Sequence, residues 1–302
     1  MPDPARHTVS ATEAPMLFNA SPYGTRWTLW QKFANGVEIP YEENERMSWG
    51  TKMQPLLLQE ASYDLKLEVQ AESQYVSRGS LGCTRDATVY CPDRGPGALE
   101  TKCVFDYRTW MQKWGGGTFV PREIEIQLQV QMFVGDGATL EFSPHTGRDG
   151  HSYNWGIIAV WVAAQMYYFE RQPVPELWGQ LERESRSFLI SVRDRIEPDP
   201  FGVPLELPLI QQLYPTREGD YLDLRDDDAE SIIQLDKSIS YLAATTQRRN
   251  ANKVAESLRA EFIAKLKGHH KMLIGGGAVV EMGKQNRLKV YVPGIPEVEG
   301  NE

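Results

Sequence analysis

The chain has 302 residues, and 32 Lys and Arg against 41 Asp and Glu give it a formal net charge of −9. Eight Trp, ten Phe and 13 Tyr are too much apolar surface to leave in water, which excludes a mainly disordered chain. The negative net charge excludes a protein with a generally basic surface that binds nucleic acid non-specifically, although it allows a local basic groove. The length is that of one large domain or two small ones.

No membrane or secretion signal is expected. The first residues, MPDPARHTVSATEAP, are polar, and the most apolar stretch, 155–169, is shorter than the roughly 20 residues of a spanning helix. Cys83, Cys91 and Cys103 lack the spacing of a zinc or iron–sulfur site. We therefore expect reduced, structural thiols in a cytoplasmic protein.

The first half of the chain is expected to place two helices before a meander of strands. Turn residues followed by an amphipathic pattern predict a helix that begins within 22–31 and ends near Asn35 and Gly36, and a second helix is expected over 44–61. Alternating or β-branched residues predict strands at 65–69, 88–90 and 98–104, with a turn at 92–97.

The second half is expected to add buried strands, a helix and an appendage. Residues 155–169 are interpreted as buried strands, and 175–196 carry apolar residues at helical spacing. The proline-rich segment 198–215 marks a boundary, which predicts a first domain over 1–215 and a second over 216–302. In the second domain, Asp226 to Asp228 can cap a long helix, and a hairpin is expected over 278–292.

The stretch 124–134 (IEIQLQVQMFV) is the most regular in the chain. Its strict alternation of apolar and polar residues predicts a half-exposed strand.

Asp86, Glu100 and Lys102 form the most informative group of chemical side chains. If 88–90 and 98–104 pair as a hairpin, Asp86 lies at the far end of one strand, and Glu100 and Lys102 share one face of the other. Two carboxylates can hold a hard divalent cation, and the lysine can orient an attacking water, which suits phosphodiester hydrolysis. A Glu-x-Lys pattern on a solvated strand face is the alternative.

Three blocks of the sequence then indicate a family. WGTKMQP near residue 49, TRDATVYCPDRGPGALETKCVFDYRTWMQKWGGG and IQLQVQMFVGDG resemble, in this order, the lambda-type exonuclease (YqaJ viral recombinase) family of phage nucleases. That family belongs to the PD-(D/E)xK nuclease superfamily, and the resemblance covers roughly residues 6 to 135. It implies an α/β fold with a central mixed β-sheet flanked by helices, followed here by a C-terminal helical and hairpin appendage.

The resemblance also implies roles for individual residues. Asp86, Glu100 and the backbone carbonyl of Thr101 would bind Mg²⁺ or Mn²⁺, and Lys102 would be the catalytic lysine. Gln127 would lie beside the active site with Gln131 one helical turn on, which makes 124–134 a helix and not a strand. Further residues would contact DNA: Arg6 and Thr12 at the 5′-phosphate, and Gln131, Lys113 and Trp114 elsewhere. Core packing is the alternative for Trp114, and a solvated terminus is the alternative for Arg6.

Gln54 departs from the family pattern. Where the family has a glutamate four residues after the Gly of the Trp-Gly pair, this chain has a neutral amide that can coordinate but carries no charge. Glu60 lies six residues further on and so points away from the face of Gln54 in a helix.

The resemblance therefore predicts a metal-dependent DNA exonuclease that digests one strand of linear duplex DNA from its end, 5′ to 3′. It also implies phage-type recombination in a bacterial host, a homo-oligomeric ring such as a trimer, and a single-strand annealing protein as partner. Two alternatives stay open. One is an endonuclease or repair nuclease on the same core; the other, motivated by Gln54, is a catalytically decayed DNA-end-binding protein.

Overall fold

The computed structural model describes residues 8–37, 45–135, 138–139, 152–213, 228–266, 270–273, 278–282 and 288–293. The chain divides into two compact units, Met1–Thr216 and Arg217–Glu302. Among the described residues, no helix combines the length and the apolar character that crossing a membrane requires.

A mixed five-stranded sheet forms the centre of the first unit, in the order β2-β5-β6-β8-β9. Its strands are β2 (Glu68–Ala71), β5 (Ala87–Cys91), β6 (Gly95–Val104), β8 (Gly156–Val162) and β9 (Gln165–Arg171). Neighbours are antiparallel except β6 and β8, which run parallel with Glu100 opposite Ile158. The sequence thus predicted a mixed sheet and its first meander correctly.

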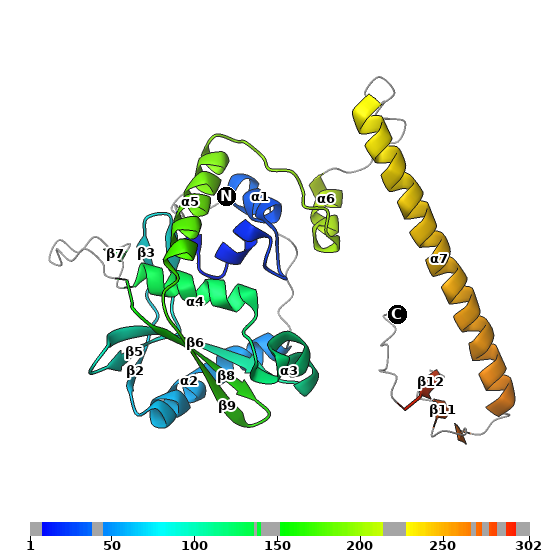
Figure 1. The fold of residues 1–302 in the computed structure, drawn as a ribbon, viewed down its shortest axis with the longest axis horizontal. Helices are drawn as coiled ribbons and strands as arrows, with labels where there is room; N and C mark the ends of the chain where they lie inside the picture. The colour runs from blue at the N-terminus through cyan, green and yellow to red at the C-terminus, as the bar shows by residue number, and fades with distance from the viewer. Residues whose placement is uncertain are drawn as a thin grey trace. The chain divides into compact units, whose positions relative to one another are not determined.

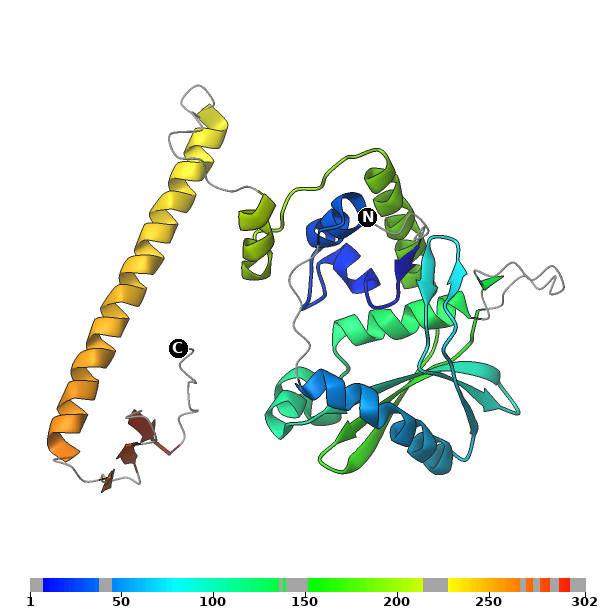
Figure 2. The same cartoon turned by 180° about the vertical axis from the view of Figure 1, so that it is seen from behind.

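Helices cover both faces of this sheet (Figures 1 and 2). Helix α2 (Glu45–Leu65) packs Leu58 and Ala61 against Val89, Leu99 and Ile157 on one face. On the other face lie α4 (Arg122–Val134) and α3 (Tyr107–Trp114), where Trp110 and Leu128 pack with Ile158 and Val160. The sheet is therefore buried on both sides, which explains the continuous apolar run in β8.

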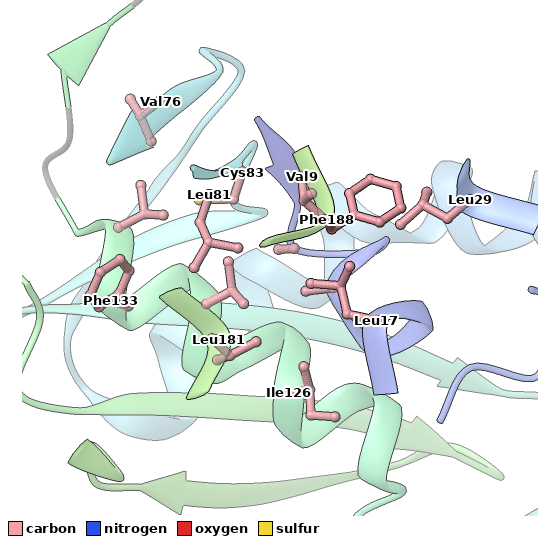
Figure 3. Close-up of a cluster of buried hydrophobic side chains, with 14 of the residues drawn as sticks. Val9, Leu17, Leu29, Val76, Leu81, Cys83, Ile126, Phe133, Leu181 and Phe188 are labelled. Carbon is pink, nitrogen blue, oxygen red and sulfur yellow. The ribbon is translucent and has the colours of Figure 1, made fainter. Parts of the chain in front are cut away.

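A second layer lies over the outer side of α4. Helices α1 (Arg26–Asn35) and α5 (Pro175–Arg193) pack there with η1 (Ala14–Phe18) and the small sheet β1-β4-β3-β7. The strands of that sheet are β1 (Val9–Ser10), β4 (Leu81–Cys83), β3 (Val76–Arg78) and β7 (Ala138–Thr139). Figure 3 shows Ile126 and Phe133 of α4 facing Leu181 and Phe188 of α5 and Leu17 of η1. None of these small strands was predicted from the sequence.

Residues 124–134, for which alternation predicts a strand and the resemblance implies a helix, lie in helix α4. Successive residues of a helix are 100° apart, so every second residue turns by 200° and alternating apolar residues fall on two opposite sides. Ile126 and Val130 accordingly join the core with α5, whereas Leu128 and Met132 join the core with the sheet. The strand prediction from alternation was wrong because this helix is buried on two sides.

Several boundaries also differ from the sequence prediction. Residues 65–69 do not form one strand, because α2 continues to Leu65 and β2 begins only at Glu68, after Lys66 in the left-handed region with φ 54°. The predicted turn at 92–97 is shorter, since β6 begins at Gly95. The connector 198–215 contains η3 (Pro204–Glu206) and α6 (Leu207–Leu213), and Leu209 is buried.

The second unit contains a 39-residue helix and a small antiparallel sheet. Helix α7 (Asp228–Leu266) begins at the predicted acidic cap, although Asp226 and Asp227 lie outside the described residues. The sheet orders β10 (Lys271–Leu273), β11 (Val279–Met282) and β12 (Leu288–Tyr291), and β11 and β12 form the expected hairpin.

Candidate active site

The register of β5 and β6 brings the two predicted carboxylates together. Ala87, the first residue of β5, pairs with Leu99 of β6, so Asp86 just before β5 comes next to Glu100. Strand β6 continues to Val104 and pairs there only with β8. The open side of β6 beyond Leu99 lines a cleft of about 580 Å³, to which Asp86, Glu100, Thr101 and Lys102 all contribute.

Glu100 is held from three directions. Its side chain is buried, and Oε1 accepts hydrogen bonds from Lys102 Nζ and from Gln127 Nε2, the latter at 2.7 Å. Oε2 accepts from Gln131 Nε2 at 2.6 Å. A buried carboxylate destabilises the fold unless it is paired with a positive charge and hydrogen-bonded. Lys102 supplies the positive charge, and the two glutamines supply further hydrogen bonds. Glu100 is therefore fixed in one orientation toward the cleft.

Asp86 lies beside it with a perturbed pKa. Its Oδ2 accepts from the backbone N and the Oγ1 of Thr101, each at 2.7 Å. Burial, and then the neighbouring charge of Glu100, raise the pKa of Asp86 to about 6, although Thr101 and Lys102 act in the opposite direction. The two carboxylates thus crowd negative charge at one point of the cleft.

Lys102 is the positive charge of the group. Its Nζ donates to Glu100 Oε1 and, at 3.2 Å, to Gln127 Oε1. Burial alone would lower the pKa of Lys102, but the charge and hydrogen bond of Glu100 raise it above its ordinary value. The raised pKa favours the protonated form of Lys102, which donates both hydrogen bonds.

The helical turn of α4 explains why two of its three glutamines reach this group. Gln127 and Gln131 are four residues apart and share the side that faces Glu100. Gln129 lies on the other side, where it donates to the Gln172 carbonyl and accepts from Trp178 Nε1. The sequence resemblance placed Gln127 and Gln131 together correctly.

The remaining predicted residues fall in different places. Gln54 of α2 lines the cleft, as does the exposed Lys113 of α3. Gln131 is completely buried and Trp114 is 3% exposed and stacked on Trp110, so both contribute to packing and support in this conformation and present no surface to DNA. Thr12 is exposed with a hydrogen bond to Ser10 and is not part of the cleft wall, and Arg6 lies outside the described residues.

Other cleft residues were missed by sequence reasoning. Arg46 pairs with Asp106 at 3.2 Å, and Tyr23 lies on the wall near Lys102. Asp106 caps α3 by accepting from Thr109 N at 2.7 Å, and the hydrogen bonds from Thr109 lower the pKa of its carboxyl group. The sequence signal for this cap was present, since Asp106 directly precedes the amphipathic run of α3.

The candidate metal-binding side chains of the cleft include one acid fewer than the family pattern has, because Gln54 stands where the family has a glutamate. Among the described residues, no group of three or more His, Cys, Asp or Glu side chains lies close enough to hold a metal ion. Asp86 and Glu100 provide two carboxylates, and Gln54 stands on the wall of the same cleft with a neutral oxygen. A cation here would bind two carboxylates and neutral oxygens.

Comparison with known proteins agrees with this geometry. The model of the YqaJ-like viral recombinase domain matches residues 5–149, which include Asp86, Glu100, Lys102 and Gln127. No curated protein matches the chain.

Three exonuclease structures are similar to this chain. The alkaline exonuclease (LHK-Exo) of Laribacter hongkongensis is 20% identical over 64% of this chain and 92% of its own, with a TM-score of 0.46. Its complex with dAMP is 17% identical over 68% and 95%, also at 0.46. A phage related exonuclease of Haemophilus somnus 129PT is 12% identical over 63% and 94%, with a TM-score of 0.45. Residues 5–149 of this chain are thus similar to the YqaJ-like viral recombinase domain.

Proposed function

We propose that this protein is a metal-dependent DNA exonuclease that digests one strand of linear duplex DNA from its end, 5′ to 3′, in phage-type homologous recombination. The observation that carries the proposal is the meeting of Asp86, Glu100, Lys102 and Gln127 at the open end of β6, within a YqaJ-like domain. Two acids, a protonated lysine and a glutamine beside an open cleft suit phosphodiester hydrolysis.

Asp86, Glu100 and the carbonyl oxygen of Thr101 would hold the cation, Mg²⁺ or Mn²⁺. The donor set fits such an ion, because carboxylate and carbonyl oxygens are the ligands that hard divalent cations prefer. The crowding that raises the pKa of Asp86 is also relieved when a cation neutralises the pair. When bound, the ion would polarise the scissile phosphate and lower the pKa of an attacking water.

Lys102 would stabilise the charge that develops on the phosphate. As a protonated amine it donates hydrogen bonds, and its Nζ is held by Glu100 and Gln127 at the cleft wall. A preorganised positive charge of this kind stabilises a transition state more than a mobile one. Gln127 bridges the two groups, since its Nε2 donates to Glu100 and its Oε1 accepts from Lys102.

We propose the DNA substrate and the biological role from the resemblance to the family. Duplex DNA ends would enter the cleft past Lys113, and Arg6 with Thr12 would receive the 5′-phosphate. We further propose a homo-oligomeric ring such as a trimer, a single-strand annealing protein as partner, and a place in the cytoplasm of a bacterial host. The two-domain division at residue 215, with the nuclease in the first domain, belongs to the same proposal.

Digestion of linear and circular duplex DNA tests the proposal. Purified protein with Mg²⁺ should release nucleotides from linear duplex and leave covalently closed circles intact, with EDTA abolishing the reaction. Cleavage of closed circles would indicate an endonuclease instead. Binding to DNA ends without digestion in Mg²⁺ or Mn²⁺ would favour the decayed end-binding protein, which the neutral Gln54 and the missing third acid suggest.

A further inference from the structure

The positive charge of the chain is concentrated near its carboxyl end. Residues 248–289 contain ten Lys or Arg and three Asp or Glu, a net charge of +7 in a chain whose total is −9. All of them belong to the second unit, Arg217–Glu302, and none belongs to the site described above. A segregation of this kind is an electrostatic footprint for a polyanion.

The basic residues share one side of α7, the long yellow-to-orange helix of Figure 1. Arg248, Arg249, Lys253 and Arg259 are all exposed. At 100° per residue they project within an arc of about 140°, which also contains the exposed Glu256 and so has a net charge of +3 from these five residues. Val254, Leu258 and Phe262 project from the opposite side of the helix. The carboxyl-terminal half of α7 is therefore an amphipathic helix with a basic face.

We propose that this basic face of α7 binds the phosphate backbone of duplex DNA. Duplex DNA carries one negative charge per about 1.7 Å of axis, so charges spaced along a helix can meet a row of phosphates. Residues 248–266 rise about 28 Å, which matches the length of about eight base pairs. Asn250 and Asn252 lie among the basic residues, and amide side chains also donate to phosphate oxygens.

The composition of the unit favours DNA over an anionic membrane. Helices that bind membrane surfaces bury large aromatic and aliphatic residues, notably Trp, in the lipid boundary. All eight Trp of this chain lie before residue 216: Trp27, Trp30, Trp49, Trp110, Trp114, Trp155, Trp161 and Trp178. Alanines make up much of the apolar side of α7 in this region, including Ala251 and Ala255. The apolar side of α7 thus carries Val254, Leu258 and Phe262 but no Trp, which makes a bilayer the less favoured partner.

The inference rests on the proposed function only for its choice of duplex DNA as the polyanion. Because the two units belong to one chain, DNA held by α7 stays at a raised local concentration for the nuclease unit. The expected consequence is longer digestion per binding event, without a change in the rate of the chemical step.

A charge-neutral variant of the full chain tests the inference. Arg248→Gln, Arg249→Gln and Lys253→Gln together remove three positive charges and keep good helix formers. The control removes three exposed positive charges of the first unit, by Lys66→Gln, Arg183→Gln and Arg186→Gln, so both proteins have the same net charge. Binding to a blunt duplex is measured by fluorescence anisotropy in EDTA, which prevents digestion, across a series of salt concentrations.

The triple variant on the basic face should bind duplex at least ~10-fold more weakly at low salt, with a log K against log salt slope reduced by about 2 to 3. The control should stay within about twofold of wild type, and the charge-conserving variant Arg248→Lys, Arg249→Lys and Lys253→Arg should keep wild-type binding. Wild-type affinity and slope in the triple variant would overturn the inference, as would a loss of binding to anionic phosphatidylserine vesicles with DNA binding unchanged. This binding assay does not depend on cleavage, so it separates the two proposals. If wild type fails to digest DNA but the triple variant still loses binding, the proposed nuclease activity is refuted and the proposed DNA-binding face of α7 is supported.

Discussion

Replacing Asp86 by Asn is expected to stabilise the metal-free protein while it removes activity. Asp86 keeps a proton to about pH 6 in the folded protein, against 3.8 for an ordinary aspartate, because burial and Glu100 disfavour its charge. The unfolded chain therefore releases this proton at lower pH than the folded chain. Ionisation of Asp86 therefore lowers the free energy of unfolding as the pH rises from about 4 to 6. Above pH 6 this loss of stability is complete and no longer changes with pH.

The size of the effect follows from the shift. Two pKa units correspond to about 3 kcal/mol, and because Asp86 is only partly buried in the cleft, solvent screening reduces this to about 1 to 3 kcal/mol. An asparagine can still accept the two hydrogen bonds from Thr101. Asp86→Asn should thus gain about 1 to 3 kcal/mol at pH 8 in EDTA and almost nothing at pH 4.

Urea unfolding followed by tryptophan fluorescence measures this gain. All eight Trp lie in the unit Met1–Thr216, so the signal reports that unit alone. Asp93→Asn in the exposed turn before β6 is the control and should change little at either pH. Adding Mg²⁺ should stabilise wild type but not Asp86→Asn. A gain of equal size at both pH values, or a loss at pH 8, would refute the electrostatic reasoning.

Four further substitutions separate chemistry from packing. Lys102→Ala should abolish digestion while circular dichroism and DNA binding persist; wild-type rates would remove Lys102 from the site. Gln131→Leu should lower kcat and leave KM for DNA unchanged, because it removes a donor to Glu100, whereas Gln129→Leu should cost stability but leave kcat intact. Equal kcat in both glutamine variants would contradict the support of Glu100. Gly97→Ala should destabilise by about 1 to 3 kcal/mol in thermal unfolding, since a Cβ would stand 2.5 Å from Trp155, and an unchanged transition would refute that close approach.

The sequence predicted the centre of the site better than its surroundings. Asp86, Glu100 and Lys102 could be placed because a hairpin register and the two-residue period of a strand define which side chains meet. The same local rules misassigned 124–134, since alternation in a helix buried on two sides imitates a strand. Only the resemblance to a family distinguished the two readings.

Residues that depend on tertiary packing were not predictable. Arg46 and Tyr23 reach the cleft from segments far from β6 in sequence, and nothing in their own sequence context indicates the site. The resemblance placed Gln131 among the DNA contacts, yet its side chain is fully buried and donates to Glu100. Strands as short as β1 and β3 exist only through their partners β4 and β7, so local propensity gives no signal for them.

The most direct test of the central claim is a crystal structure of the protein soaked with Mn²⁺, read by anomalous density. The account predicts one Mn²⁺ between Asp86 and Glu100, in contact with the Thr101 carbonyl oxygen and with Lys102 close by. An occupied Mn²⁺ site elsewhere in the first unit, with no density between these two carboxylates, would contradict it.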